Sequence, residues 1–279
     1  MHPETGKACP LGVAFGPDGN LYVADSQGLG GNTNYKSRLL KITMKEGKPV
    51  KCESVVEGLC FSNGVACLGD SVYVCETQLT PKAELPLESG VYKFTIAELT
   101  GPKPITIQKD GKDKHLAVKF ATTKEGNGAP VGANGLGFAK DGTMYVCNFG
   151  HAEILAFPLQ ANGTFGPQRT IARGGNIRCA DGLKVHPVTG KIYLADFFGN
   201  AVHEICPKSG KVRTICKSKI NNNGSGGQLD KCSEVCIRGN KIYVANIDLP
   251  FDGNEYDAPH TISVFELEEA KTPATCPKK

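Results

Sequence analysis

The chain has 279 residues, of which 40% are hydrophobic and 22% charged, and this balance is typical of a globular protein. Its 32 lysines and arginines against 28 aspartates and glutamates leave a net charge of only +4, and they are scattered along the chain, which argues against a nucleic-acid partner. No apolar run approaches the roughly 20 residues that a membrane-spanning helix needs, so we expect no membrane insertion.

Five similar segments follow one another along the chain. Each has an apolar run, a turn rich in glycine, aspartate or asparagine, and a second apolar run that ends on a polar residue; they cover residues 11–25, 63–76, 134–148, 181–196 and 234–246. The apolar runs are too short for helices and rich in Val, Ile and Tyr, and turns such as Asp141-Gly142 tolerate positive φ. We therefore predict five β-hairpins.

A third strand is expected after each hairpin, at residues 37–42, 90–94, 153–157, 201–205 and 261–265, and a weaker fourth in most modules. Modules of four antiparallel strands repeated at this spacing are typical of a β-propeller, in which each blade covers its neighbours. We predict a single all-β propeller domain over residues 1–279, with five blades. A sixth would have to be hidden between residues 63 and 134 or built from both termini.

Two of the hairpins carry a family resemblance. Residues 134–146 (NGLGFAKDGTMYV) and 181–196 (DGLKVHPVTGKIYLAD) resemble the SMP-30/gluconolactonase/LRE-like propellers, the superfamily that includes paraoxonases and diisopropyl fluorophosphatase. The resemblance covers most of the chain, although its short motifs also occur in NHL-type and strictosidine-synthase-like propellers. It implies a lactonase or esterase, typically six-bladed, with a divalent cation, often calcium, on the central axis.

The first residue of each inner strand points toward the axis of a propeller. Four of these five positions offer oxygen ligands, as a hard cation such as Ca²⁺ requires, and they are Asn63, Asn134, Asp181 and Glu234. The fifth is Leu11, where the family enzymes usually place a metal-binding Glu, and we expect Glu234 to take over that role. The alternative is that each polar residue only caps its strand and bonds the following turn.

The second strand of each hairpin returns to the same face. We therefore expect a substrate-binding rim formed by Asp25, Glu76, Asn148, Asp196 and Asn246. A lactone or ester carbonyl could bind the cation while Asp181 activates a water or attacks directly. His151, just after Asn148, is a candidate acid or base, the alternative being an exposed histidine without a role.

Two main functional classes follow from these residues. The first is a secreted, Ca²⁺-dependent hydrolase of a lactone or related ester, acting as a monomer on a small molecule. The second is a propeller that binds a ligand or partner on the same face without catalysis, with calcium in a structural role. A strictosidine-synthase-like enzyme is a further alternative, less favoured because those propellers do not rely on an axial metal.

The twelve cysteines lack the paired spacing of a zinc site, so their even number favours disulfides. Two glycosylation sequons begin at Asn162 and Asn223. Together these features predict a secreted or lumenal glycoprotein whose signal peptide has been removed, the alternative being a cytosolic protein with buried thiols. Cys9 and Cys276 flank the two ends of the repeat, and a bridge between them is one way to close the propeller.

Overall fold

The structure is a computed structural model that describes residues 1–31 and 34–267. The only helices in these residues are two short 3₁₀ turns, η1 (Glu98–Thr100) and η2 (Ser225–Gly227), and the regular structure is otherwise β. The chain divides into two compact units, residues 1–135 with 162–165 (unit 1) and residues 136–161 with 166 onward (unit 2). The boundary lies inside strand β10 (Ala133–Phe138).

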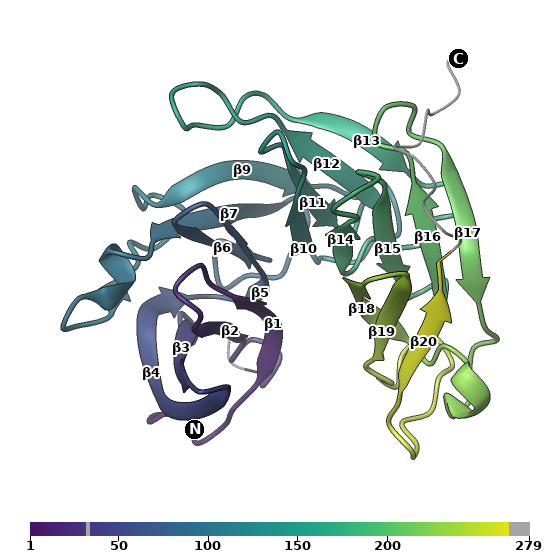
Figure 1. The fold of residues 1–279 in the computed structure, drawn as a ribbon, viewed down its shortest axis with the longest axis horizontal. Helices are drawn as coiled ribbons and strands as arrows, with labels where there is room; N and C mark the ends of the chain where they lie inside the picture. The colour runs from purple at the N-terminus through teal and green to yellow at the C-terminus, as the bar shows by residue number, and fades with distance from the viewer. Residues whose placement is uncertain (32–33, 268–279) are drawn as a thin grey trace. The chain divides into compact units, whose positions relative to one another are not determined.

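Unit 1 contains two sheets that follow each other in sequence (Figure 1). The first consists of β1 (Pro10–Phe15), β2 (Leu21–Asp25), β3 (Ser37–Lys45) and β4 (Lys48–Leu59), with β8 (Ile105–Thr106) added parallel to β4. The second consists of β5 (Ser62–Leu68), β6 (Ser71–Glu76), β7 (Leu87–Thr95) and β9 (Leu116–Thr122). Residues 63–134 therefore build one blade and lend a short strand to the preceding one, rather than hiding an extra blade.

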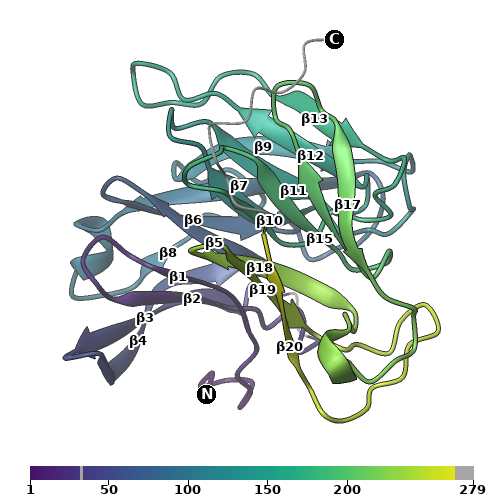
Figure 2. The same ribbon diagram turned by 45° about the vertical axis from the view of Figure 1, so that its right-hand side comes forward.

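The remaining three sheets are labelled in Figures 1 and 2. They consist of β10, β11 (Met144–Asn148), β12 (Glu153–Phe157) and β13 (Arg169–Arg173); of β14 (Leu183–Val185), β15 (Ile192–Asp196), β16 (Ala201–Ile205) and β17 (Val212–Lys217); and of β18 (Cys232–Arg238), β19 (Lys241–Asn246) and β20 (Ile262–Glu266). All five predicted hairpins and all five third strands are confirmed. The fold is all-β with five propeller blades, and the last sheet has three strands within the described residues.

Apolar layers between consecutive sheets hold each unit together. In unit 1, β2 and β3 of the first sheet pack on β5, β6 and β7 of the second through residues such as Leu39, Val74 and Phe94. In unit 2, Ile154 and Leu194 lie in the layer between the third and fourth sheets, and Val235 packs on the fourth sheet from the fifth. Each buried side chain of this size stabilises the fold by about 1.5–3 kcal/mol relative to exposure.

Glycine in the repeat serves close contact between inner strands. A Cβ on Gly12 would lie 2.4 Å from the carbonyl oxygen of Asn63, and a Cβ on Gly182 would lie 2.5 Å from that of Ser233. The Gly182 N–H donates to the same Ser233 oxygen at 2.8 Å. Only a residue without a side chain permits this approach, which explains why glycine recurs at the start of these hairpins.

The thiols differ from the sequence expectation. Of the eleven cysteines among the described residues, Cys206 is disulfide-bonded and the other ten form no disulfide. Cys9 is one of these ten, so the proposed Cys9–Cys276 bridge is wrong; Cys276 itself lies outside the described residues. Buried cysteines such as Cys147 and Cys232 serve as small apolar side chains of the core layers. Both sequon asparagines, Asn162 and Asn223, are exposed. No helix among the described residues is long and apolar enough to cross a membrane.

Candidate functional site

In every antiparallel hairpin the first strand begins and the second strand ends at the same end of the sheet. At this end, here called the strand-entry end, the predicted metal ligands lie at the start of the first strand and the predicted rim residues lie at the end of the second strand. The sequence repeat alone predicts that these residues lie at the strand-entry end, since their spacing relative to the two apolar runs is the same in each module.

Asn63 and Asn134 lie in unit 1 and are linked through one side chain. The Asn63 amide donates to Thr77 Oγ1 at 3.2 Å, and that hydroxyl donates to the carbonyl of Ala133 at 2.6 Å, next to Asn134. Asn134 itself is buried. The entry residues of β5 and β10 are therefore close neighbours, and both carry an amide oxygen, which is a hard ligand.

Asp181 and Glu234 form the equivalent pair in unit 2. Their strands are joined by the Gly182–Ser233 hydrogen bond, and a Cβ on Gly182 would lie only 2.6 Å from Glu234 Oε1. Glu234 accepts the N–H of Val235 at 2.8 Å and lies 3.6 Å from Lys184 Nζ. Its side chain keeps 36% of its surface open, yet the surrounding protein desolvates it and raises its pKa, against the opposing effect of Lys184. A carboxylate in this state suits a cation, as does the mixed set of amide and carboxylate oxygens.

The five predicted rim residues are all buried, with exposed fractions between 0% and 9%. Four have the same kind of partner, a backbone N–H in the segment that enters the first strand of their own hairpin. The N–H groups of Cys9, Phe61, Cys179 and Asp230 donate to Asp25, Glu76, Asp196 and Asn246 respectively. In this conformation these side chains fix the strand-entry loops, a role that we call the entry lock, and a direct contact with substrate remains a prediction.

The entry lock is strongest at Asp196 in the fourth sheet. Its carboxylate accepts N–H groups from Arg178 at 2.8 Å, Cys179 at 3.0 Å and Gly199 at 2.8 Å, and His203 Nε2 lies at 3.1 Å. Burial raises the pKa of Asp196, but these partners outweigh it and the pKa lies below its ordinary value. Asp196 therefore stays ionised although it is fully buried.

His151 is a buried histidine rather than an exposed loop residue, with 8% of its surface open. Its Nδ1 lies 3.3 Å from the carboxylate of Glu153, which also accepts the hydroxyl of Thr170. A carboxylate behind the ring orients the imidazole. The catalytic role of His151 stays a prediction, now with a positioning partner.

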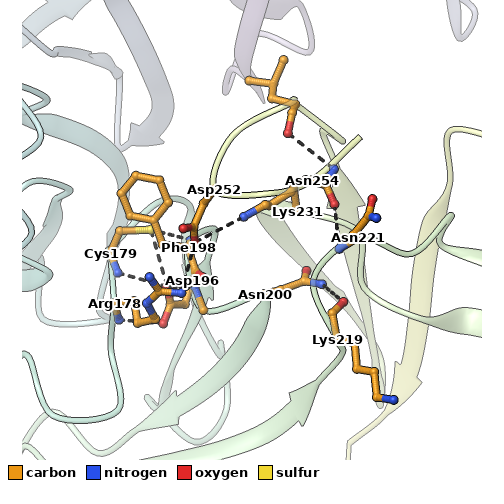
Figure 3. A network of polar contacts seen from close by, with 12 residues as sticks. Arg178, Cys179, Asp196, Phe198, Asn200, Lys219, Asn221, Lys231, Asp252 and Asn254 are labelled. Atoms are coloured by element: carbon orange, nitrogen blue, oxygen red, sulfur yellow. Dashed lines mark hydrogen bonds and ion pairs between the residues drawn. The ribbon is translucent and has the colours of Figure 1, made fainter. Parts of the chain in front are cut away.

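A second group of residues at the strand-entry end of unit 2 was missed by the sequence analysis. The Lys231 side chain is fully buried, with its Nζ 3.8 Å from Asp252 and 5.1 Å from the centre of the Phe197 ring. Arg178 lies 3.1 Å from the same Asp252 oxygen and donates to the carbonyl of Phe198 at 2.8 Å. Figure 3 shows both cations directed at this one carboxylate.

Aromatic rings surround this cluster. Phe149 and Phe198 are 5.2 Å apart and nearly perpendicular, and Phe197 lies 6.3 Å from Phe251, whose side chain is 55% exposed. Burial lowers the pKa of Lys231, although Asp252 opposes the shift. Two cations share one carboxylate beside apolar rings, an arrangement that suits a ligand with an apolar body and an anionic end. The charged residues Arg178, Lys231 and Asp252 come from three distant segments, so no single motif could have revealed them.

The five sheets define a β-propeller, and comparison with solved structures agrees. A putative gluconolactonase is 19% identical with a TM-score of 0.55, over 88% of this chain and 72% of that one. A luciferin-regenerating enzyme is 15% identical with a TM-score of 0.55, over 89% and 72% of the two chains.

A PQQ-bound aldose sugar dehydrogenase from Streptomyces coelicolor is 15% identical with a TM-score of 0.57, over 95% and 83% of the two chains. No family model and no curated protein matches the sequence. The resemblance to gluconolactonase-like propellers is thus confirmed for the fold. Similarity at this level of identity does not extend to activity.

Proposed function

We propose that the chain is a Ca²⁺-dependent hydrolase of lactones or related esters. The observation that supports this most is the pair Asp181 and Glu234, two carboxylates on neighbouring inner strands joined by the Gly182–Ser233 hydrogen bond. Asn63 and Asn134, at the equivalent positions of unit 1, are a second pair of oxygen donors. A divalent cation bound there would polarise the substrate carbonyl and stabilise the developing oxyanion.

Residues of unit 2 would supply the proton chemistry and part of the binding. Asp181 is half-buried and can accept the proton of an attacking water. His151, oriented by Glu153, can hold or return a proton. Arg178 and Lys231, which both lie against Asp252, would attract the carboxylate that forms when a lactone or ester opens.

The test is a panel of lactones and aryl esters assayed with and without a chelator, together with metal analysis of the purified protein. We expect turnover that the chelator abolishes and added Ca²⁺ restores. Asp181→Asn should lower kcat by at least about 100-fold with little change in thermal stability, since an amide cannot take a proton. Asp141→Asn is the matched control, because Asp141 only accepts the N–H of Thr143 in the turn at the opposite end of its hairpin.

The result also separates the two functional classes. Undiminished turnover in Asp181→Asn would contradict the assigned role of this residue, and turnover that is insensitive to chelation would contradict the metal. Absence of turnover across the panel, with tight binding of the same compounds, would instead favour a non-catalytic binding propeller.

A further inference from the structure

Three aspartates meet near the end of unit 2, away from the ligand set proposed above. Asp230 directly precedes Lys231 and β18, Asp248 follows β19 by two residues, and Asp257 lies in the connection from β19 to β20. One carboxylate oxygen of each lies within 4.8 Å of the others. Three segments of the last module therefore bring their negative charges to one point.

The cluster is buried, and part of it has no partner. Asp230 and Asp248 are each only 1% exposed. Asp230 Oδ1 and Asp257 Oδ1 are shielded from solvent and accept no hydrogen bond from any described residue. A carboxylate oxygen removed from water without a partner costs several kcal/mol, so the two unpaired oxygens call for a positive group between them.

The neighbouring side chains do not supply that charge. Asp248 accepts the amide of Asn254 at 2.9 Å, and His260 Nδ1 lies 3.2 Å from its other oxygen. Lys231 is adjacent to Asp230 in sequence, but its ammonium is directed at Asp252 (Figure 3). Among the described residues, His260 is thus the basic side chain that lies against the three carboxylates.

We propose that Asp230, Asp248 and Asp257 form a calcium site. Oxygens on one Ca²⁺ at about 2.3–2.6 Å can be up to about 5 Å apart, whereas the shorter bonds of Mg²⁺, about 2.1 Å, limit them to about 4.2 Å. The three oxygens lie within 4.8 Å of one another, and Ca²⁺ can span this whole range. The donor set consists of carboxylate oxygens, which Ca²⁺ prefers.

The ion would tie the connection between β19 and β20 to the entry of β18. Asn254 already braces this connection, because its side-chain oxygen accepts the N–H of Asn221 at 3.1 Å (Figure 3). Its amide group donates to Asp248. The same connection carries Phe251 and Asp252 to the Lys231 cluster. Calcium at the three aspartates would therefore hold in place the connection that carries Asp252 to Lys231 and Arg178. None of its three ligands belongs to the proposed Asp181–Glu234 pair.

The test compares the whole chain with Asp230→Asn and with Asp252→Asn, using Ca²⁺ as the probe in equilibrium dialysis and thermal unfolding. Asp252→Asn is the matched control because it makes the same charge change in the same connection but pairs with Arg178 and Lys231. We expect Asp230→Asn to bind one Ca²⁺ fewer per chain than both other proteins. The measured quantity is the difference between the proteins in the number of Ca²⁺ ions bound per chain, so an ion at the Asp181–Glu234 pair, present in all of them, does not affect it.

The unfolding measurement guards against a variant that merely misfolds. In chelator, Asp230→Asn should unfold at the same or a higher temperature than the parent, since it relieves repulsion among the carboxylates. Added Ca²⁺ should then raise the Tm of the parent and of Asp252→Asn more than that of Asp230→Asn. Equal numbers of bound ions in all three proteins, or the same loss in the control, would overturn the proposal.

Discussion

Gly182→Ala is the most direct probe of the contact that positions Asp181 and Glu234. The new methyl carbon would lie 2.5 Å from Ser233 O and 2.7 Å from Glu234 Cα. Both are backbone atoms, so relief requires the inner strands of the fourth and fifth sheets to separate. The change also stretches the 2.8 Å hydrogen bond from the Gly182 N–H to Ser233.

The expected cost lies at the upper end of the range for overpacking, about 3 kcal/mol, because no side chain can rotate away. A loss of this size lowers the Tm of a domain by about 6–12 °C. Thermal unfolding followed by circular dichroism measures it. Binding of Ca²⁺ at the Asp181–Glu234 pair should weaken in parallel, because the two carboxylates move with their strands.

Gly101→Ala provides the control. Gly101 has φ of −60°, and an added Cβ would meet nothing closer than 3.4 Å. It should be neutral or slightly stabilising, since alanine restricts the unfolded chain. If Gly182→Ala unfolds at the parent temperature, the close approach of the inner strands does not constrain this position and the explanation of the repeated glycine fails.

Two further predictions concern the entry lock. Burial raises the pKa of Glu76 from 4.5 to about 8, so the folded state keeps a proton that the unfolded state releases. The free energy of unfolding should therefore fall as pH rises from about 4.5 to about 8. Urea unfolding across this range should show this fall in the parent and not in Glu76→Gln. Asp196→Asn should lower the free energy of unfolding by about 3 kcal/mol, because an amide cannot accept the N–H groups of Arg178, Cys179 and Gly199 as a carboxylate does. A decrease no larger than that of Asp141→Asn would refute this prediction.

The blades could be predicted because their information is local. Alternating apolar residues and turns such as Asp141-Gly142 define each hairpin within about 15 residues, and the structure has β10 and β11 on either side of that turn. The short strand β8 was missed, since Ile105 and Thr106 join the preceding sheet through a parallel pairing that leaves no periodic signal.

Polar residues were harder to interpret than strands. Asp181 and Asp196 look alike in sequence, each beside a strand and each suited to a site, but Asp196 accepts three backbone N–H groups and is fully buried. A repeated polar position signals a repeated requirement of the module, which can be hydrogen bonding as well as chemistry. The cluster of Lys231 with Arg178 and Asp252 left no signal, because its members come together only through folding.

The entry lock joins two positions of the same hairpin, as in the bond from the Cys9 N–H to Asp25 or from the Asp230 N–H to Asn246. A copy of such a hairpin carries both halves of the bond with it. Tandem duplication of one ancestral module would therefore multiply blades whose loops are already braced, and later divergence could alter the entry residues without loosening their frame. Leu11 and Glu234 occupy equivalent positions at the start of their hairpins, although one is apolar and the other acidic. In the same two hairpins, Asp25 and Asn246 accept equivalent hydrogen bonds from backbone N–H groups.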